Sequence, residues 1–163
     1  MTNITPNITL EMALYSDTAK KHNIKNIANT GHINNIKISA NILEIINTEI
    51  NTRLNLSGFN FRFTSFFRCF ELNKKVGGSI TSAHAKGLAI DLHHKTLSDR
   101  DLYKIIYSIY KSGKIANLDQ LILELRPASS WVHIGFALNN PRHQFLVSPK
   151  VGKYILATAK ELI

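Results

Sequence analysis

The chain has 163 residues, of which 44% are hydrophobic and 19% are charged, a balance typical of folded globular proteins rather than disordered ones. This length predicts a single domain over residues 1–163. Cys69 is the one cysteine, so an internal disulfide is excluded. No apolar run approaches the roughly 20 residues that span a bilayer, and the first residues lack the basic segment and apolar core of a secretory signal. We therefore expect no transmembrane segment and no signal peptide, and a monomer is the expected state.

Lysine and arginine outnumber aspartate and glutamate by 20 to 11, which gives a formal net charge of +9. Such a surface favours polyanionic partners: nucleic acid, anionic lipid or the acidic polymers of a cell wall. The basic residues are scattered, however, and Lys20-Lys21 and Lys74-Lys75 are the only adjacent pairs. Because the chain has no basic helix and no arginine-rich run, a nucleic-acid partner is not expected.

Two helices are predicted before residue 55. Thr9 is placed to cap a helix that runs to Lys21, with Met12 at its third position. After a polar, asparagine-rich connection through Asn34, the range 36–54 has the 3.6-residue period of an amphipathic helix. The apolar face expected for this second helix comprises Ile38, Ile42, Ile45, Ile46 and Ile50.

Two strands and a helix are predicted in the middle of the chain. Phenylalanines alternate with polar residues over 59–65, which is the pattern of a strand buried on one side. Apolar residues also alternate over 88–93, and the polar face of this second strand carries Asp91. A capping box that begins at Ser98 precedes a helix, for which Gly113 is the expected stop.

A hairpin is predicted near the C-terminal end. Strands over 120–126 and 131–137 would flank a four-residue turn, Pro127–Ser130. This register places Glu124 opposite His133, on the same face of the sheet with Cβ atoms about 5 Å apart. A one-residue change in register would instead put the two side chains on opposite faces.

The tail over residues 150–163 is predicted to be a final helix, although Gly152 lies within it. The expected fold class is therefore α+β, with a small antiparallel sheet flanked by helices in a single domain. Its core is expected over about residues 8–142, followed by a C-terminal extension over 143–163.

His84, Asp91 and His133 offer two imidazoles and one carboxylate beside short apolar runs. Three protein donors with a fourth position open to water are typical of a catalytic zinc site, whereas structural zinc sites close with four ligands, often cysteines. The alternative is a buried polar trio satisfied by hydrogen bonds, and spacing alone favours that alternative. His93 shares the face of Asp91, so it could compete as a ligand or support one. His94 points the other way and is expected to face solvent.

Glu124 and Arg68 are the candidate catalytic residues. Zinc makes bound water more acidic and polarises the carbonyl under attack, but the water still needs a proton acceptor that is not a ligand. Glu124, within an apolar run, suits that role; the alternative is a cross-strand salt bridge to a nearby arginine or lysine. Arg68 has a planar guanidinium that can hold a carboxylate by two hydrogen bonds. The alternative for Arg68 is a surface pair with Glu71.

Several segments together carry a family resemblance. They are Ser65–Asn73, Val76–Ser79, Ser82–His84, Gly87, Ala89–Asp91 and Trp131–Ile134, with Ser16–Ala19 and Asp119–Ile122 fitting as well. The combined pattern covers about residues 8–142 and resembles the zinc D-alanyl-D-alanine carboxypeptidase family. More narrowly, it is similar to the phage-associated branch of compact peptidoglycan peptidases.

The resemblance implies a zinc ion (Zn2+) held by His84, Asp91 and His133. It also implies that Arg68 and Ser82 contact the substrate, with Arg68 near its terminal or scissile carbonyl. Trp131 is a further candidate substrate contact. In several relatives the catalytic acid lies three residues before the last histidine ligand. In this chain that place is taken by Ser130, which cannot act as that acid.

Glu124 matches the acidic residue of the phage-associated branch. The chain departs from the family pattern at Phe66-Phe67, Cys69 and Gly135. These departures concern substrate contacts more than metal binding, and they leave open a weakened enzyme.

The expected function is therefore a zinc metallopeptidase that hydrolyses peptide bonds of bacterial peptidoglycan. It would act as a D-alanyl-D-alanine carboxypeptidase or an L-alanyl-D-glutamate endopeptidase, with Glu124 as general base and cell-wall peptidoglycan as partner. The alternative is a catalytically weak or inactive wall-binding module, or a virion structural component, on the same scaffold. As an endolysin the protein would stay in the host cytoplasm before release to the wall, or it would be carried on the virion.

Overall fold

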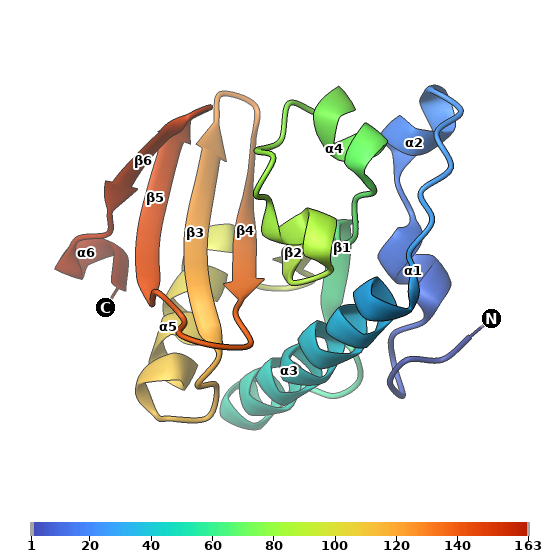
Figure 1. Ribbon diagram of the computed structural model, residues 1–163. Coiled ribbons are helices and arrows are strands. Elements are labelled where there is room, and N and C mark those ends of the chain that lie inside the picture. Colours follow the sequence, from blue (N-terminus) through green and yellow to red (C-terminus); the bar gives the residue numbers. More distant parts are fainter. Residues whose placement is uncertain (1, 163) are drawn as a thin grey trace.

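The computed structural model describes residues 2–162. Its elements follow one another from the blue N-terminal end to the red C-terminal end of Figure 1. They are α1 (Leu10–Leu14), α2 (Asp17–Lys21), α3 (Thr30–Leu54), β1 (Phe61–Ser65), α4 (Phe70–Lys75), the 3-10 helix η1 (Ala83–Lys86), β2 (Ala89–His94), α5 (Asp99–Lys111), β3 (Leu118–Arg126), β4 (Ser129–Phe136), β5 (Gln144–Lys150), β6 (Lys153–Leu156) and α6 (Ala159–Leu162).

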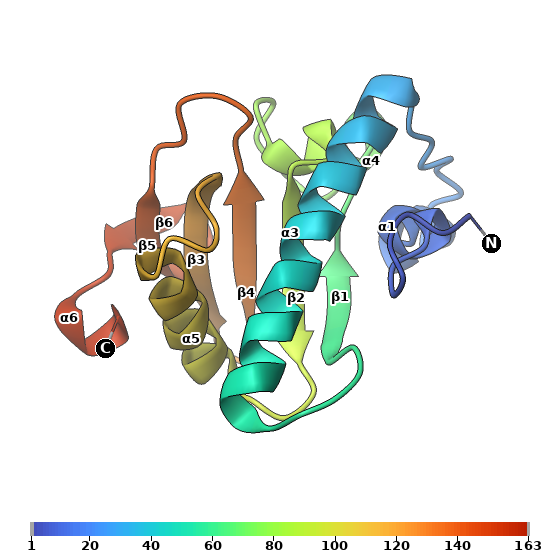
Figure 2. The ribbon, with the colours of Figure 1, turned by 90° about the horizontal axis from the view of Figure 1, so that it is seen from below.

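The strands form one six-stranded sheet in the order β1-β2-β4-β3-β5-β6. Neighbouring strands are antiparallel, except that β5 runs parallel to β3. Helices α3 and α5 lie on the same side of this sheet, as the view from below shows (Figure 2). The predicted α+β class is therefore confirmed. Among the described residues, no helix combines the length and the apolar character needed to cross a bilayer.

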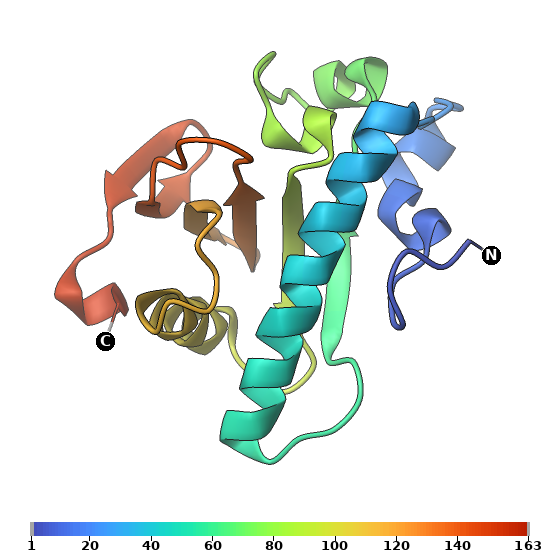
Figure 3. The same ribbon diagram turned by 60° about the horizontal axis from the view of Figure 1, so that its bottom comes forward.

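The two faces of the sheet differ in character because successive strand residues point to opposite sides. Helices α3 and α5 cover one face of the sheet (Figure 3). This face is apolar and belongs to the hydrophobic core. It carries Ile90, Leu92, Leu121, Leu123, Val132 and Ile134. The residues between them, Asp91, Ile122, Glu124 and His133, therefore lie on the opposite face, where a groove is found.

The first predicted helix is divided into α1 and α2. Thr9 caps α1 as predicted, because its hydroxyl accepts a hydrogen bond from the backbone N–H of Met12. Tyr15 is extended, and the Ser16 hydroxyl then accepts from the N–H of Ala19 and starts α2. A second capping residue, Ser16, lies inside the predicted helix and thus divides it into two helices.

Helix α3 begins six residues before the predicted start at residue 36. Asn29 caps it in a box with His32, so part of the asparagine-rich connection is helical. The predicted apolar face is also rotated: Ile46 and Ile50 are buried, but Ile45 is exposed. The buried stripe includes Ile36, Ser39, Ala40, Leu43 and Asn47 in addition.

The hairpin is tighter than predicted, and the predicted register is wrong. Strands β3 and β4 extend to Arg126 and Ser129, so the turn between them has two residues instead of four. Glu124 pairs with Trp131, and His133 pairs with Ile122. The shift is two residues along the strand, which preserves the alternation. Glu124 and His133 therefore share a face, although they are diagonal neighbours and not opposite ones.

The tail is mostly extended, so the helix predicted over 150–163 is wrong; residue 163 lies outside the described residues. Gly152 has φ of +72° and turns the chain between β5 and β6. Residues Ala159–Leu162 alone are helical. Strand β5 pairs with β3 and β6 with β5, which adds two strands to the sheet beyond the hairpin.

Candidate metal centre and substrate groove

His84 is held in place by the close packing of the end of η1 against α3 and by one hydrogen bond. The chain leaves η1 through Gly87 at φ +75°, where an added Cβ would lie 2.8 Å from Cγ1 of Ile36. His84 is buried, and its Nδ1 lies 2.7 Å from the carbonyl oxygen of Phe66. Because a carbonyl oxygen only accepts, Nδ1 carries the hydrogen and donates it. The Nε2 of a neutral His84 therefore presents its lone pair to the site.

Asp91 and His133 are brought together by the pairing of β2 with β4. They are direct partners in this antiparallel ladder, so their side chains leave the same face of the sheet. Asp91 Oδ1 lies 2.8 Å from His133 Nδ1. Gly135 leaves room beside the imidazole, since a Cβ there would lie 3.4 Å from His133 Nε2.

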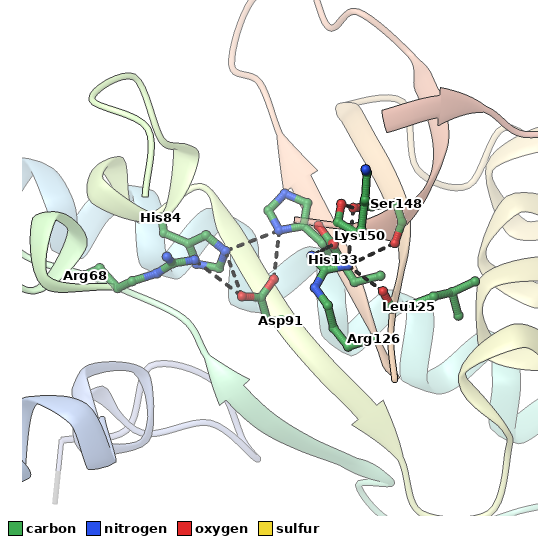
Figure 4. Close-up of polar contacts among 9 residues, drawn as sticks. Arg68, His84, Asp91, Leu125, Arg126, His133, Ser148 and Lys150 are labelled. Atoms are coloured by element: carbon green, nitrogen blue, oxygen red, sulfur yellow. Dashed lines mark hydrogen bonds and ion pairs between the residues drawn. The ribbon is translucent and has the colours of Figure 1, made fainter. Parts of the chain in front are cut away.

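The three side chains converge to the spacing of metal ligands. His84 Nε2 lies 3.2 Å from His133 Nδ1 and 3.2 Å from Asp91 Oδ2 (Figure 4). A tetrahedral zinc ion about 2.0–2.1 Å from each donor places its ligand atoms roughly 3.3 Å apart. The lone pair of His84 Nε2 also faces a carboxylate oxygen, and a cation between them relieves that repulsion. The donor set and its spacing therefore fit a zinc ion held by these three residues.

Burial and mutual contact shift the pKa values of this cluster. Burial lowers the pKa of His84, and the Asp91 charge opposes that shift. Burial alone would raise the pKa of Asp91, but the neighbouring His84 and a hydrogen bond from His133 hold it far below its usual value. Asp91 is thus a carboxylate, and His84 favours its neutral form. Both are the protonation states that metal coordination requires.

Arg68 lies beside the cluster. Its Nη2 is 3.3 Å from Asp91 Oδ2, so it pairs with this carboxylate and the alternative pairing with Glu71 is wrong. Its Nε is buried and has no hydrogen-bond partner among the described residues. Burial lowers the pKa of Arg68, and Asp91 opposes that shift. The guanidinium therefore retains donor capacity next to the metal centre.

Glu124 is buried and forms an ion pair, at 2.5 Å between its Oε2 and Nη2 of Arg126. The salt bridge considered as the alternative role for Glu124 therefore exists, but it joins two residues of β3 and does not cross to another strand. Arg126 is itself fixed by hydrogen bonds to the carbonyl oxygens of Leu125 and Ser148. Figure 4 draws this second polar network next to the one around Asp91.

Both networks line one groove of about 1450 Å³. Arg68, Asp91, His133 and Glu124 contribute to its wall, as do the two predicted substrate contacts Ser82 and Trp131. The Arg126 guanidinium lies over the Trp131 ring, 5.1 Å from its centroid. The predicted site residues therefore share a single open space, except His84, which is buried next to it.

Sequence reasoning missed one part of this groove. His93 Nδ1 lies 2.8 Å from Asp99 Oδ1, and the Ser130 hydroxyl donates to Asp99 Oδ2 at 2.5 Å. His93 is thus paired with Asp99 and lies outside the metal-ligand cluster found among the described residues. The one available signal was the capping box, which places Asp99 at the start of α5.

His94 is buried, so the expectation that it faces solvent is wrong. Its Nδ1 accepts hydrogen bonds from the backbone N–H groups of Thr96 and Leu97. The turn after β2 therefore folds back over this imidazole.

Comparison with known proteins agrees with the geometry. A family model described as Peptidase M15 matches residues 18–134, more than half of the chain. No curated protein matches the chain significantly. The matched range contains all three residues of the cluster together with Arg68 and Glu124. Peptidases of this family are zinc-dependent hydrolases, and the chain belongs to the peptidase M15 family.

Proposed function

We propose that this protein is a zinc metallopeptidase that hydrolyses peptide bonds of bacterial peptidoglycan. The observation that carries the proposal is the convergence of His84, Asp91 and His133, whose ligand atoms lie within 4.8 Å of one another beside a groove that Asp91 and His133 line. Family membership supports the reaction class. The net charge of +9 favours residence on an anionic wall.

His84, Asp91 and His133 would hold the zinc ion. When bound there, zinc supplies Lewis acidity, which makes water more acidic and polarises a substrate carbonyl. The remaining chemistry belongs to side chains that are not ligands. Arg68 would donate to the substrate's terminal carboxylate or to the oxygen of the scissile carbonyl, because its side chain lines the groove and its Nη2 lies 3.3 Å from Asp91 Oδ2.

Glu124 is the proposed general base. Its carboxylate takes a proton from the attacking water and returns it to the leaving amine. One of its oxygens, Oε2, is held by Arg126, which fixes the orientation of the carboxylate. The other oxygen, Oε1, forms no hydrogen bond within the described part of the chain and remains available. Ser82 and Trp131 contact the substrate along the groove.

The proposed target is a D-alanyl-D-alanine bond or an L-alanyl-D-glutamate bond. The similarity of residues 65–91 to the phage-associated branch supports action during release from an infected cell or from a virion. Muropeptide mass spectrometry after incubation of sacculi with zinc-loaded protein identifies the bond. A mass loss of one alanine indicates the carboxypeptidase, and release of a stem peptide that lacks its first L-alanine, which stays on the glycan, indicates the endopeptidase.

Glu124→Gln tests the mechanism. The variant keeps the volume of the side chain and loses its basicity, so we expect turnover of purified peptidoglycan to fall by about 10²–10⁴-fold. Zinc content should stay at the wild-type value, because Glu124 is not a ligand. Unchanged turnover in a zinc-loaded Glu124→Gln protein removes Glu124 from the mechanism.

A second candidate is a wall-binding module with little or no catalysis. The observation that favours it is the Glu124–Arg126 ion pair, which engages one oxygen of the carboxylate that must accept a proton. This candidate predicts stoichiometric zinc and sedimentation with sacculi, but no released product. Product formation that depends on zinc eliminates it.

A further inference from the structure

We infer that His93, backed by Asp99 and Ser130, forms a second binding position in the groove, where His93 Nε2 accepts a hydrogen bond from a peptide N–H of the substrate. This inference rests on the proposed function and extends it, because it assigns how the peptide is held next to the metal centre. None of the three residues is a candidate metal ligand.

The three side chains form a continuous chain of hydrogen bonds. Asp99 Oδ1 lies 2.8 Å from His93 Nδ1, and Asp99 Oδ2 accepts from the Ser130 hydroxyl at 2.5 Å. They come from the end of β2, the first turn of α5 and the start of β4. Because both oxygens of Asp99 are engaged and its side chain is 12% exposed, the carboxylate is held in one orientation.

The carboxylate determines which ring nitrogen of His93 carries the hydrogen. A carboxylate only accepts, so Nδ1 donates to Asp99 and the neutral ring keeps its lone pair on Nε2. Asp99 is also at the N-terminal end of a 13-residue helix, where a negative charge is favoured. Among residues 2–162, Nε2 of His93 has no hydrogen-bond partner, and it is not a buried atom. It is therefore an unpartnered acceptor on a side chain that lines the groove.

The position of His93 suits a substrate contact. His93 lines the same groove as the metal cluster and follows Asp91 by two residues on the same strand. Alternate strand residues share a face and are about 6.6 Å apart. An extended peptide advances by about 3.3–3.6 Å per residue. If the scissile carbonyl of a substrate lies near Asp91, the peptide group one or two residues further along the substrate therefore lies near His93.

The chemistry of the position selects an N–H donor. An anionic group would meet the negative charge of Asp99 directly behind the ring, whereas Arg68 already offers a cation beside Asp91. Peptide N–H groups are the donors that recur along a stem peptide. Trp131, which also lines this part of the groove, offers an apolar surface for the peptide chain.

The test compares stem peptides with analogues in which single amide groups are replaced by esters, so that one N–H is removed at a time. Trp131 is the single tryptophan of the chain, so its fluorescence reports binding without turnover. Binding is measured on zinc-loaded Glu124→Gln protein with and without His93→Leu. We expect about tenfold weaker binding for one ester position when His93 is present, the size of one hydrogen bond. His93→Leu should bind the amide peptide about tenfold more weakly and no longer distinguish that ester.

Two further variants separate a binding role from a structural one. In Asp99→Asn the side-chain amide can donate to His93 Nδ1, which moves the ring hydrogen to Nε2 and converts the acceptor into a donor. This change is visible in the nitrogen chemical shifts of His93, and peptide binding should weaken about tenfold with the fold retained. His93→Gln keeps an acceptor oxygen and should recover part of the binding. His22→Leu, which removes an exposed imidazole outside the groove, is the matched control.

The outcomes distinguish this inference from the proposed function. If wild-type protein cleaves peptidoglycan and each ester weakens binding equally with and without the His93→Leu substitution, the inference is overturned and the enzyme stands. If the ester effect depends on His93 but zinc-loaded protein never cleaves, the binding position stands and the peptidase proposal fails. A His93 ring with its hydrogen on Nε2 in the wild-type protein also overturns the inference.

Discussion

His84 Nε2 lies 3.2 Å from His133 Nδ1, although the two residues are 49 positions apart in the chain. Each imidazole is fixed by a different element: His84 by its hydrogen bond to the Phe66 carbonyl in the loop after β1, and His133 by the ladder between β2 and β4. Their meeting point is therefore determined by the packing of η1 against the sheet. A change that moves either element should weaken the shared metal site.

Removal of zinc should destabilise the protein. A ligand that binds only the folded state stabilises it by about 2.7 kcal/mol at one hundred times its Kd. At about 2–4 °C per kcal/mol for a chain of this size, a chelator should lower Tm by roughly 5–10 °C. Thermal unfolding with and without chelator checks this expectation. His84→Ala should abolish the difference and the bound zinc, whereas His22→Leu should retain both.

Gly87→Ala should disturb the metal centre. An added Cβ would lie 2.8 Å from Ile36 Cγ1 and 2.9 Å from the His32 carbonyl oxygen, at a φ of +75°. Gly113 has a similar φ of +79° but nothing within 4 Å of an added Cβ. Gly113→Ala therefore measures the cost of the backbone conformation without a steric clash. We expect Gly113→Ala to cost about 1 kcal/mol. Gly87→Ala should cost about 1–3 kcal/mol more, because of the clash.

Urea unfolding measures both glycine variants, and zinc titration measures the consequence for the site. Zinc affinity should fall in Gly87→Ala alone, since η1 carries His84. Equal unfolding free energies for the two variants would show that the contact with α3 is not tight.

Arg126→Met should reduce turnover. Arg126 holds Glu124 Oε2 and is itself held by the Ser148 carbonyl, so its loss frees the carboxylate to rotate. We expect kcat to fall about tenfold or more, while zinc content is unchanged. Steady-state kinetics on a defined muropeptide checks this. A rise in kcat would instead mean that the ion pair restrains Glu124 in an unproductive position, and would support the weakly catalytic alternative.

The Asp119–Arg142 pair should make stability depend on acid pH. Burial raises the pKa of Asp119, but hydrogen bonds from the Arg142 guanidinium and backbone N–H outweigh it and lower the pKa below its usual value. A lowered carboxyl pKa contributes stability that is fully present above the unfolded value near 4 and is lost as pH falls through the folded value.

Arg142→Met should therefore cost about 1 kcal/mol at pH 7, since the guanidinium is half exposed to solvent. The cost should diminish toward pH 2, as the carboxyl becomes protonated. Urea unfolding at both pH values checks this, with exposed Arg62→Met as the control. A cost that is equal at pH 2 and pH 7 would assign the effect to packing and not to charge.

Local signals in the sequence predicted several elements correctly. The hydroxyls of Thr9 and Ser98 cap helices as expected, because a cap requires only residues three positions apart. The alternation around Asp91 placed this carboxylate on the polar face of its strand for the same reason. The buried face of α3 was harder to predict from the sequence. Isoleucine occurs all around this helix, and only packing against the sheet shows which isoleucines are buried.

The sequence by itself determined which donor atoms are available and on which side of its own strand each one lies, since strand alternation is a local property. The tertiary structure alone decided the hairpin register, the strands β5 and β6 and the approach of Asp99 to His93. Each of these depends on contacts between segments far apart in the chain. Such contacts are selected by the packing of whole faces, and no window of neighbouring residues contains that information.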